Sequence, residues 1–507
     1  MPSPAGARRL RVCTLTFNAP DEVSVFRARL PPADFEVTDL TPSERPETIT
    51  QAVRTGATPW IANECRDDLR CDVVVVSAEF AGRFFGTGEV LLGLQDMEEA
   101  SCRRSCDGLF HAPREVFLLG CNTLATKDPD RRSPAEYLQV LLDHDYERGL
   151  AERIVAQRYG PLGPSFRESV RRVFSGVPRI YGFSSVAPVG SRTAPMLRRY
   201  FDLRGDYRRY LDTAGRSTAR NAELFTAFRG TDLVQVAGLT PKEPAAADRE
   251  PICALYDARR SVAARLRVVL RLLERDDFLA FLPTIEVFFA AHPIDSLQGE
   301  ERTLVESIRR DARARDQVLE LVRTLDVSAL RLEFANLAAH LGWMSQEEFR
   351  TLAIHDTHEI VRGPLTLEAV DILCEIARHE RLGATLDGAT LPDGLFHHAK
   401  GLRLLDCLSP PDPRVSVRLV DALHDDDENT RLWGVYVLSG RLPLADAVLR
   451  RLAPHLVDPS TDLRDRLRRI FVAQSARLPI DDDVQRTVAR YDPSLAGALE
   501  ARMSPRR

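Results

Sequence analysis

The sequence of 507 residues has no apolar run long enough to cross a membrane. Its most apolar stretch, Phe278 to Ala291, contains Pro283 and Glu286 and is shorter than the roughly 20 residues of a spanning helix. Three arginines between residues 8 and 11 precede any apolar segment of signal-peptide length. We therefore expect a cytoplasmic protein without a membrane segment.

The chain also lacks a large excess of charge of either sign. It has 69 Lys and Arg residues against 74 Asp and Glu residues, which gives a formal net charge of -5 and excludes the bulk basicity of a dedicated nucleic-acid binder. Arginines and aromatics alternate locally at residues 198–201 and 207–210. That pattern is typical of a single-strand nucleic-acid surface or, as we favour, of an amphipathic connector. We do not expect nucleic acid as a partner.

Nucleotide-binding and metal-binding motifs are also absent. No G-x-x-x-x-G-K-[ST] or G-x-G-x-x-G motif follows a predicted strand, so no nucleotide cofactor is expected. Four cysteines suggest zinc at first sight: Cys65, Cys71, Cys102 and Cys106. Five residues separate Cys65 from Cys71, which is not the usual spacing of a zinc knuckle. For His355 and His358, a solvated helix start is the favoured interpretation over a metal site. We expect no metal and no cofactor, and we expect the nine cysteines of a cytoplasmic chain to be reduced thiols.

The first 200 residues alternate strand and helix signals. Apolar runs typical of strands occupy Leu10–Asn18, Phe35–Leu40, Asp72–Ala78, Glu115–Gly120 and Arg179–Phe183. Continuous β-branched runs such as DVVVVSA suit strands that are buried on both faces of a parallel sheet. Helix signals alternate with the strands, at residues 46–53, at 94–106 and after the capping serines Ser133 and Ser165. The sequence predicts an α/β domain over residues 1–200, with a mainly parallel sheet flanked by helices.

From about residue 250 the strand signals disappear. Long amphipathic patterns predict an all-α domain over residues 251–507, joined to the sheet domain by a connector over 201–250. An aspartate six residues before an arginine recurs near the C-terminus: Asp412 and Arg418, Asp425 and Arg431, Asp458 and Arg464. The last two copies start 33 residues apart, a period typical of helical repeats. This domain looks like a HEAT-type array that binds a protein partner.

Cys121 is the best-marked candidate for chemistry. It follows the buried strand EVFLLG, and reactive groups of open α/β sheets gather where such strands end. A thiol at that edge can be partly exposed and close to helix N-termini, which lower its pKa. An ordinary packed core cysteine is the alternative.

The stretch VFLLGCNTLA, residues 116–125, resembles the nucleophile strand of caspase-like cysteine peptidases, particularly of the bacterial CHAT branch. The preceding strand DVVVVSA and its loop EFAGRFFG also match the order of elements in that family. The resemblance covers roughly residues 8–190. It implies a cysteine peptidase with a role in regulated bacterial proteolysis or defence, and a protein or peptide as substrate or partner.

The sequence departs from the family at the catalytic base. Glu79 stands where the family places its histidine, 42 residues before Cys121. A carboxylate beside a thiol disfavours the thiolate, whereas an imidazole would accept its proton and stabilise it. A solvated or ion-paired Glu79 is the alternative to a role in the site.

Other side chains could complete the site. The resemblance places Ser184 and Ser185 in a substrate cleft, and the amides near Gly82 and Gly120 at an oxyanion. Arg83 and Arg192 could bind an acidic side chain, although solvated arginines are the simpler interpretation.

The only histidines of the sheet domain are His111 and His144, and we expect both at the edge of the sheet opposite Cys121. An imidazole could instead come from His355, His358, His397 or His398. Three functions therefore remain open: a cysteine endopeptidase, an inactive caspase-like scaffold or sensor, and a nucleic-acid binder.

Overall fold

The structure, a computed structural model, describes most of the 507 residues. The described ranges are 8–42, 60–66, 68–86, 90–127, 132–143, 146, 148–160, 165–243, 249–276, 278–377 and 380–503. The described part of the chain divides into two compact units: residues 8–42, 60–320 and 340–343 belong to the first, and residues 321–339 and 344–503 belong to the second. The helix predicted at 46–53 lies outside the described residues.

The first unit contains a six-stranded, mostly parallel sheet. Its strands have the order β2-β1-β3-β7-β8-β9: β1 Leu10–Thr16, β2 Phe35–Asp39, β3 Val73–Ser77, β7 Glu115–Leu119, β8 Ile180–Phe183 and β9 Leu233–Val236. The first five strands pair in parallel, and only β9 is antiparallel to its neighbour β8. The α/β class and the five predicted strands are confirmed.

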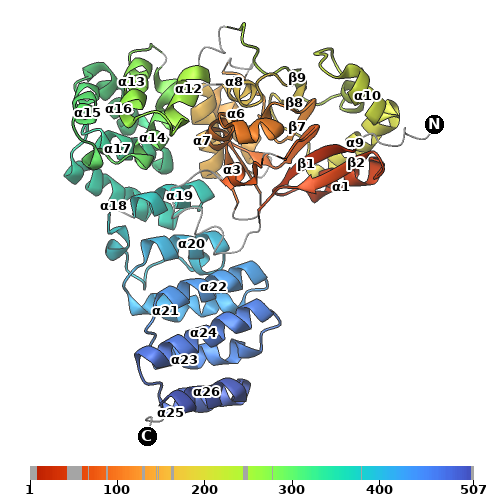
Figure 1. The fold of residues 1–507 in the computed structure, drawn as a ribbon. Helices are drawn as coiled ribbons and strands as arrows, with labels where there is room; N and C mark the ends of the chain where they lie inside the picture. Colours follow the sequence, from red (N-terminus) through yellow and green to blue (C-terminus); the bar gives the residue numbers. More distant parts are fainter. Residues whose placement is uncertain are drawn as a thin grey trace. The chain divides into compact units, whose positions relative to one another are not determined.

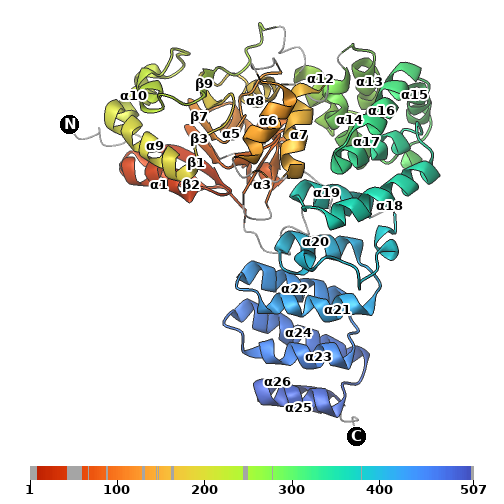
Figure 2. The ribbon, with the colours of Figure 1, turned by 180° about the vertical axis from the view of Figure 1, so that it is seen from behind.

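Helices cover both faces of this sheet (Figures 1 and 2). Val73 and Val75 of β3 pack toward one face, whereas Val74 and Val76 pack toward the other, as the alternation of side chains along a strand requires. The helices of the first face are α1 Pro20–Arg29, α9 Gly190–Arg204, α10 Tyr207–Ala214 and α11 Ala222–Ala227. Those of the second are α3 Trp60–Glu64, α4 Leu94–Ser101, α5 Asp107–Phe110 and α8 Phe166–Val173.

Short elements surround the carboxyl ends of the central strands. A small antiparallel sheet follows β3 and consists of β4 Glu79–Phe80, β5 Arg83–Phe85 and β6 Leu92–Gly93. After β7 come α6 Pro134–Leu142, which begins at the predicted capping box of Ser133, and α7 Arg148–Tyr159. The main sheet also continues beyond residue 200, where we expected it to end. The segment predicted as a connector over 201–250 contains α10, α11 and β9.

A group of helices completes the first unit. It comprises α12 Arg249–Tyr256, α13 Val262–Leu273, α14 Leu282–Ala291 and α15 Glu300–Arg309, and α16 Ala312–Thr324 passes into the second unit. Residues 304–325, which follow one amphipathic pattern in the sequence, therefore belong to two helices. Asp311 ends the first one and accepts a hydrogen bond from the Ala314 amide at 2.9 Å, which caps the second.

The second unit is entirely helical in its described residues. Its helices are α17 Ser328–His340, α18 Gln346–Arg362, α19 Leu367–Ile376, α20 Ala399–Leu408, α21 Pro413–Leu419, α22 Glu428–Gly440, α23 Asp446–Leu452, α24 Thr461–Arg477, α25 Asp482–Tyr491 and α26 Pro493–Met503. From α20 onward they stack in two columns: α20, α22, α24 and α26 pack in sequence, beside α21, α23 and α25 (Figure 1).

The recurring aspartate and arginine pattern has a structural reason in this stack. Arg431 of α22 donates to the carbonyl oxygen of Asp425 at 2.9 Å and also to the Asp458 carboxylate at 3.1 Å. Arg464 of α24 likewise donates to the carbonyl oxygen of Asp458. Each arginine thus fixes the loop before its own helix, and Arg431 also bridges to the next loop. The first copy differs, because Arg418 donates to Gly388 instead.

The expectation of reduced cysteines is wrong for eight of the nine. They form four disulfides: Cys13–Cys71, Cys65–Cys106, Cys102–Cys253 and Cys374–Cys407. The pairing also replaces the zinc interpretation. The cysteine partners are 33 to 151 residues apart in sequence, so local spacing could not reveal them.

Candidate functional site

Cys121 lies just beyond the carboxyl end of β7, next to the ends of β3 and β8. It is half-buried and is the one free cysteine of the chain. Gly120 precedes it at a tight crossing, where a Cβ would lie 2.6 Å from the carbonyl oxygen of Ala78. The backbone of Gly120 can therefore pass close to the end of β3, and this approach positions Cys121 at the edge of the sheet.

The surroundings of the sulfur keep the thiol protonated. Burial raises the pKa of Cys121. The Tyr146 hydroxyl and the Ala187 amide, whose nitrogen is 3.2 Å from the sulfur, lower this pKa in part. The negative charge of Glu79 raises the Cys121 pKa further. On balance the Cys121 pKa is above its ordinary value, so few molecules carry a thiolate at neutral pH.

Glu79 is the first residue of β4 and is exposed. Its Oε1 accepts a hydrogen bond from the Asn18 side chain at 3.4 Å. Gly82 forms the turn that follows, with a φ of 79°, and its carbonyl oxygen accepts from the Leu94 amide at 3.2 Å. The structure thus brings Glu79 within electrostatic reach of Cys121, at the position where the resemblance calls for a histidine.

Asn122 holds the turn after Cys121 in a conformation that few residues adopt. Its φ is 60°, in the left-handed region that asparagine tolerates better than most side chains. Its amide nitrogen donates to the Ser185 carbonyl oxygen at 2.7 Å, and its side-chain oxygen accepts from Tyr137 and Arg158. The asparagine was visible in the sequence, but nothing there indicated its partners.

Helices α6 and α7 cover this edge of the sheet. Tyr137 and Tyr146 pack in a cluster with Ala81, and Cys121 lies against that cluster. The Arg158 guanidinium lies over the Tyr137 ring, 4.2 Å from its centre. Helix α6 packs on the segment after β3 through Tyr137, Leu141 and Ala81. His144 lies outside the described residues.

The two serines after β8 differ in their surroundings. Ser185 is buried next to Asn122, and its hydroxyl accepts a hydrogen bond from Arg132 at 3.2 Å. Ser184 is half-buried, and both its amide and its hydroxyl donate to the carbonyl oxygen of Asp232. The structure therefore places Ser185, and not Ser184, beside the turn that carries Cys121.

The remaining candidates differ in their distance from this edge. Arg83 is in β5, which pairs with β4, the strand of Glu79, and Arg192 is exposed in the first turn of α9. The aromatics at 200, 201 and 207 are buried in the core, so they offer no stacking surface for nucleic-acid bases. The histidines at 355, 358, 397 and 398 belong to the second unit.

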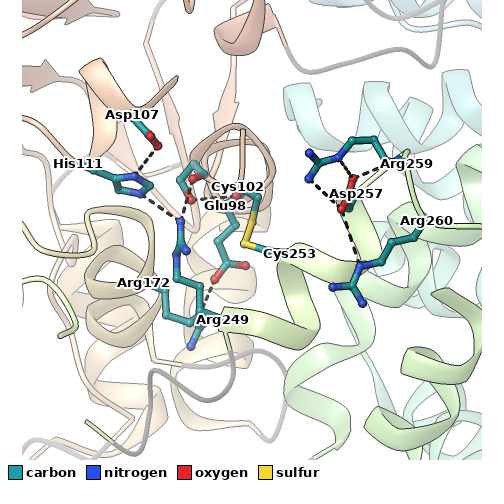
Figure 3. Close-up of a disulfide and its surroundings, with 11 residues drawn as sticks. Glu98, Cys102, Asp107, His111, Arg172, Arg249, Cys253, Asp257, Arg259 and Arg260 are labelled. Carbon is teal, nitrogen blue, oxygen red and sulfur yellow. Dashed lines mark hydrogen bonds and ion pairs between the residues drawn. A yellow bond between two sulfur atoms is a disulfide. The ribbon is translucent and has the colours of Figure 1, made fainter. Parts of the chain in front are cut away.

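His111 lies before β7, at the opposite edge from Cys121, as expected. Its Nδ1 is 2.9 Å from Asp107, and Arg249 donates to its Nε2 at 3.2 Å (Figure 3). Burial and the charge of Arg249 lower the pKa of His111. Among the described residues, no imidazole hydrogen-bonds to the Cys121 sulfur, and none is a main cause of its pKa shift.

His355, Asp356 and Glu359 form a cluster of potential metal ligands on α18. However, Arg331 donates to Asp356 at 2.6 Å and to Glu359 at 3.3 Å. The guanidinium already balances these carboxylates, so the cluster is an ion-pair network and offers no argument for a metal.

A scan against family models and searches of curated proteins and of solved structures found no match to this chain. In addition, no described helix combines the length and apolar composition that a membrane span requires.

Proposed function

We propose that this chain is a caspase-like protein of the CHAT type that acts as a scaffold or sensor through protein–protein interaction, without an activated nucleophile. The observation that carries the proposal is the environment of Cys121. Its neighbour is the Glu79 carboxylate, and burial together with this charge raises the pKa of the thiol.

The chemistry of thiol proteases explains why this matters. Attack on a peptide carbonyl requires a thiolate, which an adjacent imidazole provides by accepting the proton and then carrying a positive charge. Glu79 carries a negative charge instead, and that charge destabilises the thiolate. The site therefore retains the position of a nucleophile but not its activation.

A cysteine endopeptidase is the second candidate, because Cys121 is free and half-buried and accepts a hydrogen bond from a backbone amide. In that case Cys121 would attack a peptide carbonyl, and amides near Gly82 and Gly120 would stabilise the oxyanion. Glu79 would occupy the position of the base, and a partner would have to supply the activating group. The resemblance implies regulated bacterial proteolysis or defence as the setting.

The second unit supplies the partner-binding part of the proposal. Its two-column stack and the hydrogen bonds of Arg431 and Arg464 to the loops before their own helices support a HEAT-like array, a type of repeat whose extended surface binds proteins or peptides.

The cytoplasmic location expected from the N-terminal sequence remains a prediction. Four disulfides argue against it, since disulfides persist mainly in oxidising compartments.

The substitution Glu79→His tests the scaffold proposal. Because the other eight cysteines are paired, iodoacetamide reports on Cys121 alone. At pH 7 we expect slow alkylation of the wild type and an increase of about tenfold or more in Glu79→His, since an imidazolium stabilises the thiolate. Glu79→Gln is the matched control, and it should give only a small increase because it removes the charge without adding a cation. Rapid alkylation of the wild type, together with peptide cleavage that Cys121→Ala abolishes, would establish the endopeptidase instead.

A further inference from the structure

One disulfide joins elements that are far apart in the sequence. Cys102 is at the C-terminal end of α4, Cys253 is in α12, and 151 residues separate them (Figure 3). Cys13–Cys71 and Cys65–Cys106 join segments within the sheet domain, and Cys374–Cys407 joins α19 to α20. Of the four disulfides, only Cys102–Cys253 fastens the helices after residue 249 to the sheet domain.

Among the four disulfides, Cys102–Cys253 is the one in which neither cysteine is buried. Cys102 and Cys253 are both half-buried. Each of the other three disulfides has at least one cysteine that is no more than 3% exposed: Cys13, Cys71, Cys106 and Cys374. A thiolate must reach a sulfur atom to open a disulfide. Cys102–Cys253 offers two half-buried cysteines, Cys374–Cys407 offers one, at Cys407, and the other two disulfides offer none.

Separate contacts hold the two joined helices. Glu98 of α4 forms a buried ion pair with Arg172 of α8 at 2.7 Å, and this pair fixes α4 to the sheet domain (Figure 3). Arg249 of α12 contacts the sheet domain and donates to the Ser101 carbonyl oxygen at 2.9 Å and to His111. If the disulfide opened, α4 would keep its own ion-pair anchor, whereas α12 would keep the polar contacts of Arg249 and the packing of its buried apolar residues Ile252, Ala254 and Leu255.

We propose that Cys102–Cys253 is a redox-operated staple, which a dithiol reductant opens before the other three disulfides and which then releases α12 from α4. A thiolate of the reductant attacks one sulfur and forms a mixed disulfide, and its second thiol resolves this intermediate. Two electrons and two protons pass to the protein, which gains two cysteine thiols, and the reductant becomes a cyclic disulfide. This inference does not depend on the function of Cys121.

Graded reduction of the full chain with dithiothreitol, followed by N-ethylmaleimide alkylation and peptide mass spectrometry, tests the order of opening. Cys121 labels without reductant and serves as the internal reference. We expect Cys102 and Cys253 to gain label together at the lowest reductant concentration. Opening of another disulfide first, or of all four together, would overturn the proposal.

Hydrogen exchange tests the release of α12. At the reductant concentration that opens only this disulfide, we expect exchange in α12 to become about tenfold faster or more, with little change in α4. Cys102→Ser/Cys253→Ser should show fast α12 exchange without reductant and no further change with it. The control Cys65→Ser/Cys106→Ser should still respond to reductant in α12. Unchanged exchange in α12 after opening would contradict the release.

Discussion

Glu22 lies in the first turn of α1, 2% exposed, and its carboxylate accepts a hydrogen bond from the Ser77 hydroxyl at 2.6 Å. Burial raises its pKa from 4.5 to about 7. Because the folded state holds this proton more tightly than the unfolded state does, Glu22 stabilises the fold fully below about pH 4.5. This contribution disappears as the pH rises through about 7.

We therefore predict that Glu22→Gln removes a pH dependence of the wild-type stability. The wild type should lose about 3 kcal/mol of unfolding free energy between pH 4.5 and pH 8 through this group, because one pKa unit corresponds to about 1.4 kcal/mol. The amide resembles the protonated acid and should not show this loss. Denaturant unfolding at several pH values measures the difference. The exposed control Glu250→Gln should follow the wild type, and equal pH profiles for all three proteins would contradict the assignment.

Residue identity alone gave the position of Cys121 but not its environment. A cysteine after a continuous apolar strand predicts its place at the carboxyl edge, because parallel strands end together there. Tyr146 and Ala187, which modulate the Cys121 pKa, come from segments 25 and 66 residues further along the chain. No local pattern identifies such contacts, because tertiary packing determines them.

Among the secondary-structure elements, the positions of the long ones could be predicted from the sequence, whereas those of the short ones could not. The five parallel strands were recognisable because continuous β-branched and apolar runs suit strands covered on both faces. Strands β4, β5 and β6 have only two or three residues, too few for a period to show. The break between α15 and α16 was visible in principle, since Asp311 is a typical capping residue.

A buried network joins β7 to the helices of the first face. Glu115 at the start of β7 is fully buried and accepts hydrogen bonds from Arg179 at 2.9 Å and from three tyrosine hydroxyls, those of Tyr181, Tyr207 and Tyr210. Tyr207 and Tyr210 belong to α10. The network therefore attaches α10 to the amino edge of the sheet and balances the charge of Arg179, which is 1% exposed.

We predict that Glu115→Gln lowers the unfolding free energy by about 3 to 5 kcal/mol, because it leaves the Arg179 charge buried without its carboxylate. Tyr210→Phe removes one hydrogen bond from the same carboxylate and should cost only about 1 kcal/mol. Denaturant unfolding of both variants measures these changes. If Glu115→Gln were no less stable than Tyr210→Phe, the charge balance would not be the stabilising interaction.

At the scale of the whole molecule, composition predicted an α/β part followed by a helical part. The boundary between these two parts was not predictable from composition, because β9 joins the sheet after a helical stretch and the compact first unit continues to residue 320. The prediction of reduced cysteines was wrong because a disulfide depends on which distant segments of the chain meet, and local sequence patterns do not show this. The resemblance to caspase-like peptidases rests on residues 116–125, and Glu79 stands where that family has a histidine.

The pH dependence of Cys121 alkylation in the wild-type chain decides whether the thiol is activated. With eight cysteines paired, iodoacetamide follows the ionisation of one thiol. Burial and the nearby Glu79 charge predict a midpoint above that of an exposed cysteine, with the rate still rising beyond pH 8.5. A rate that has already reached its plateau at pH 7 would show an activated thiolate and would contradict the proposal of an inactive scaffold.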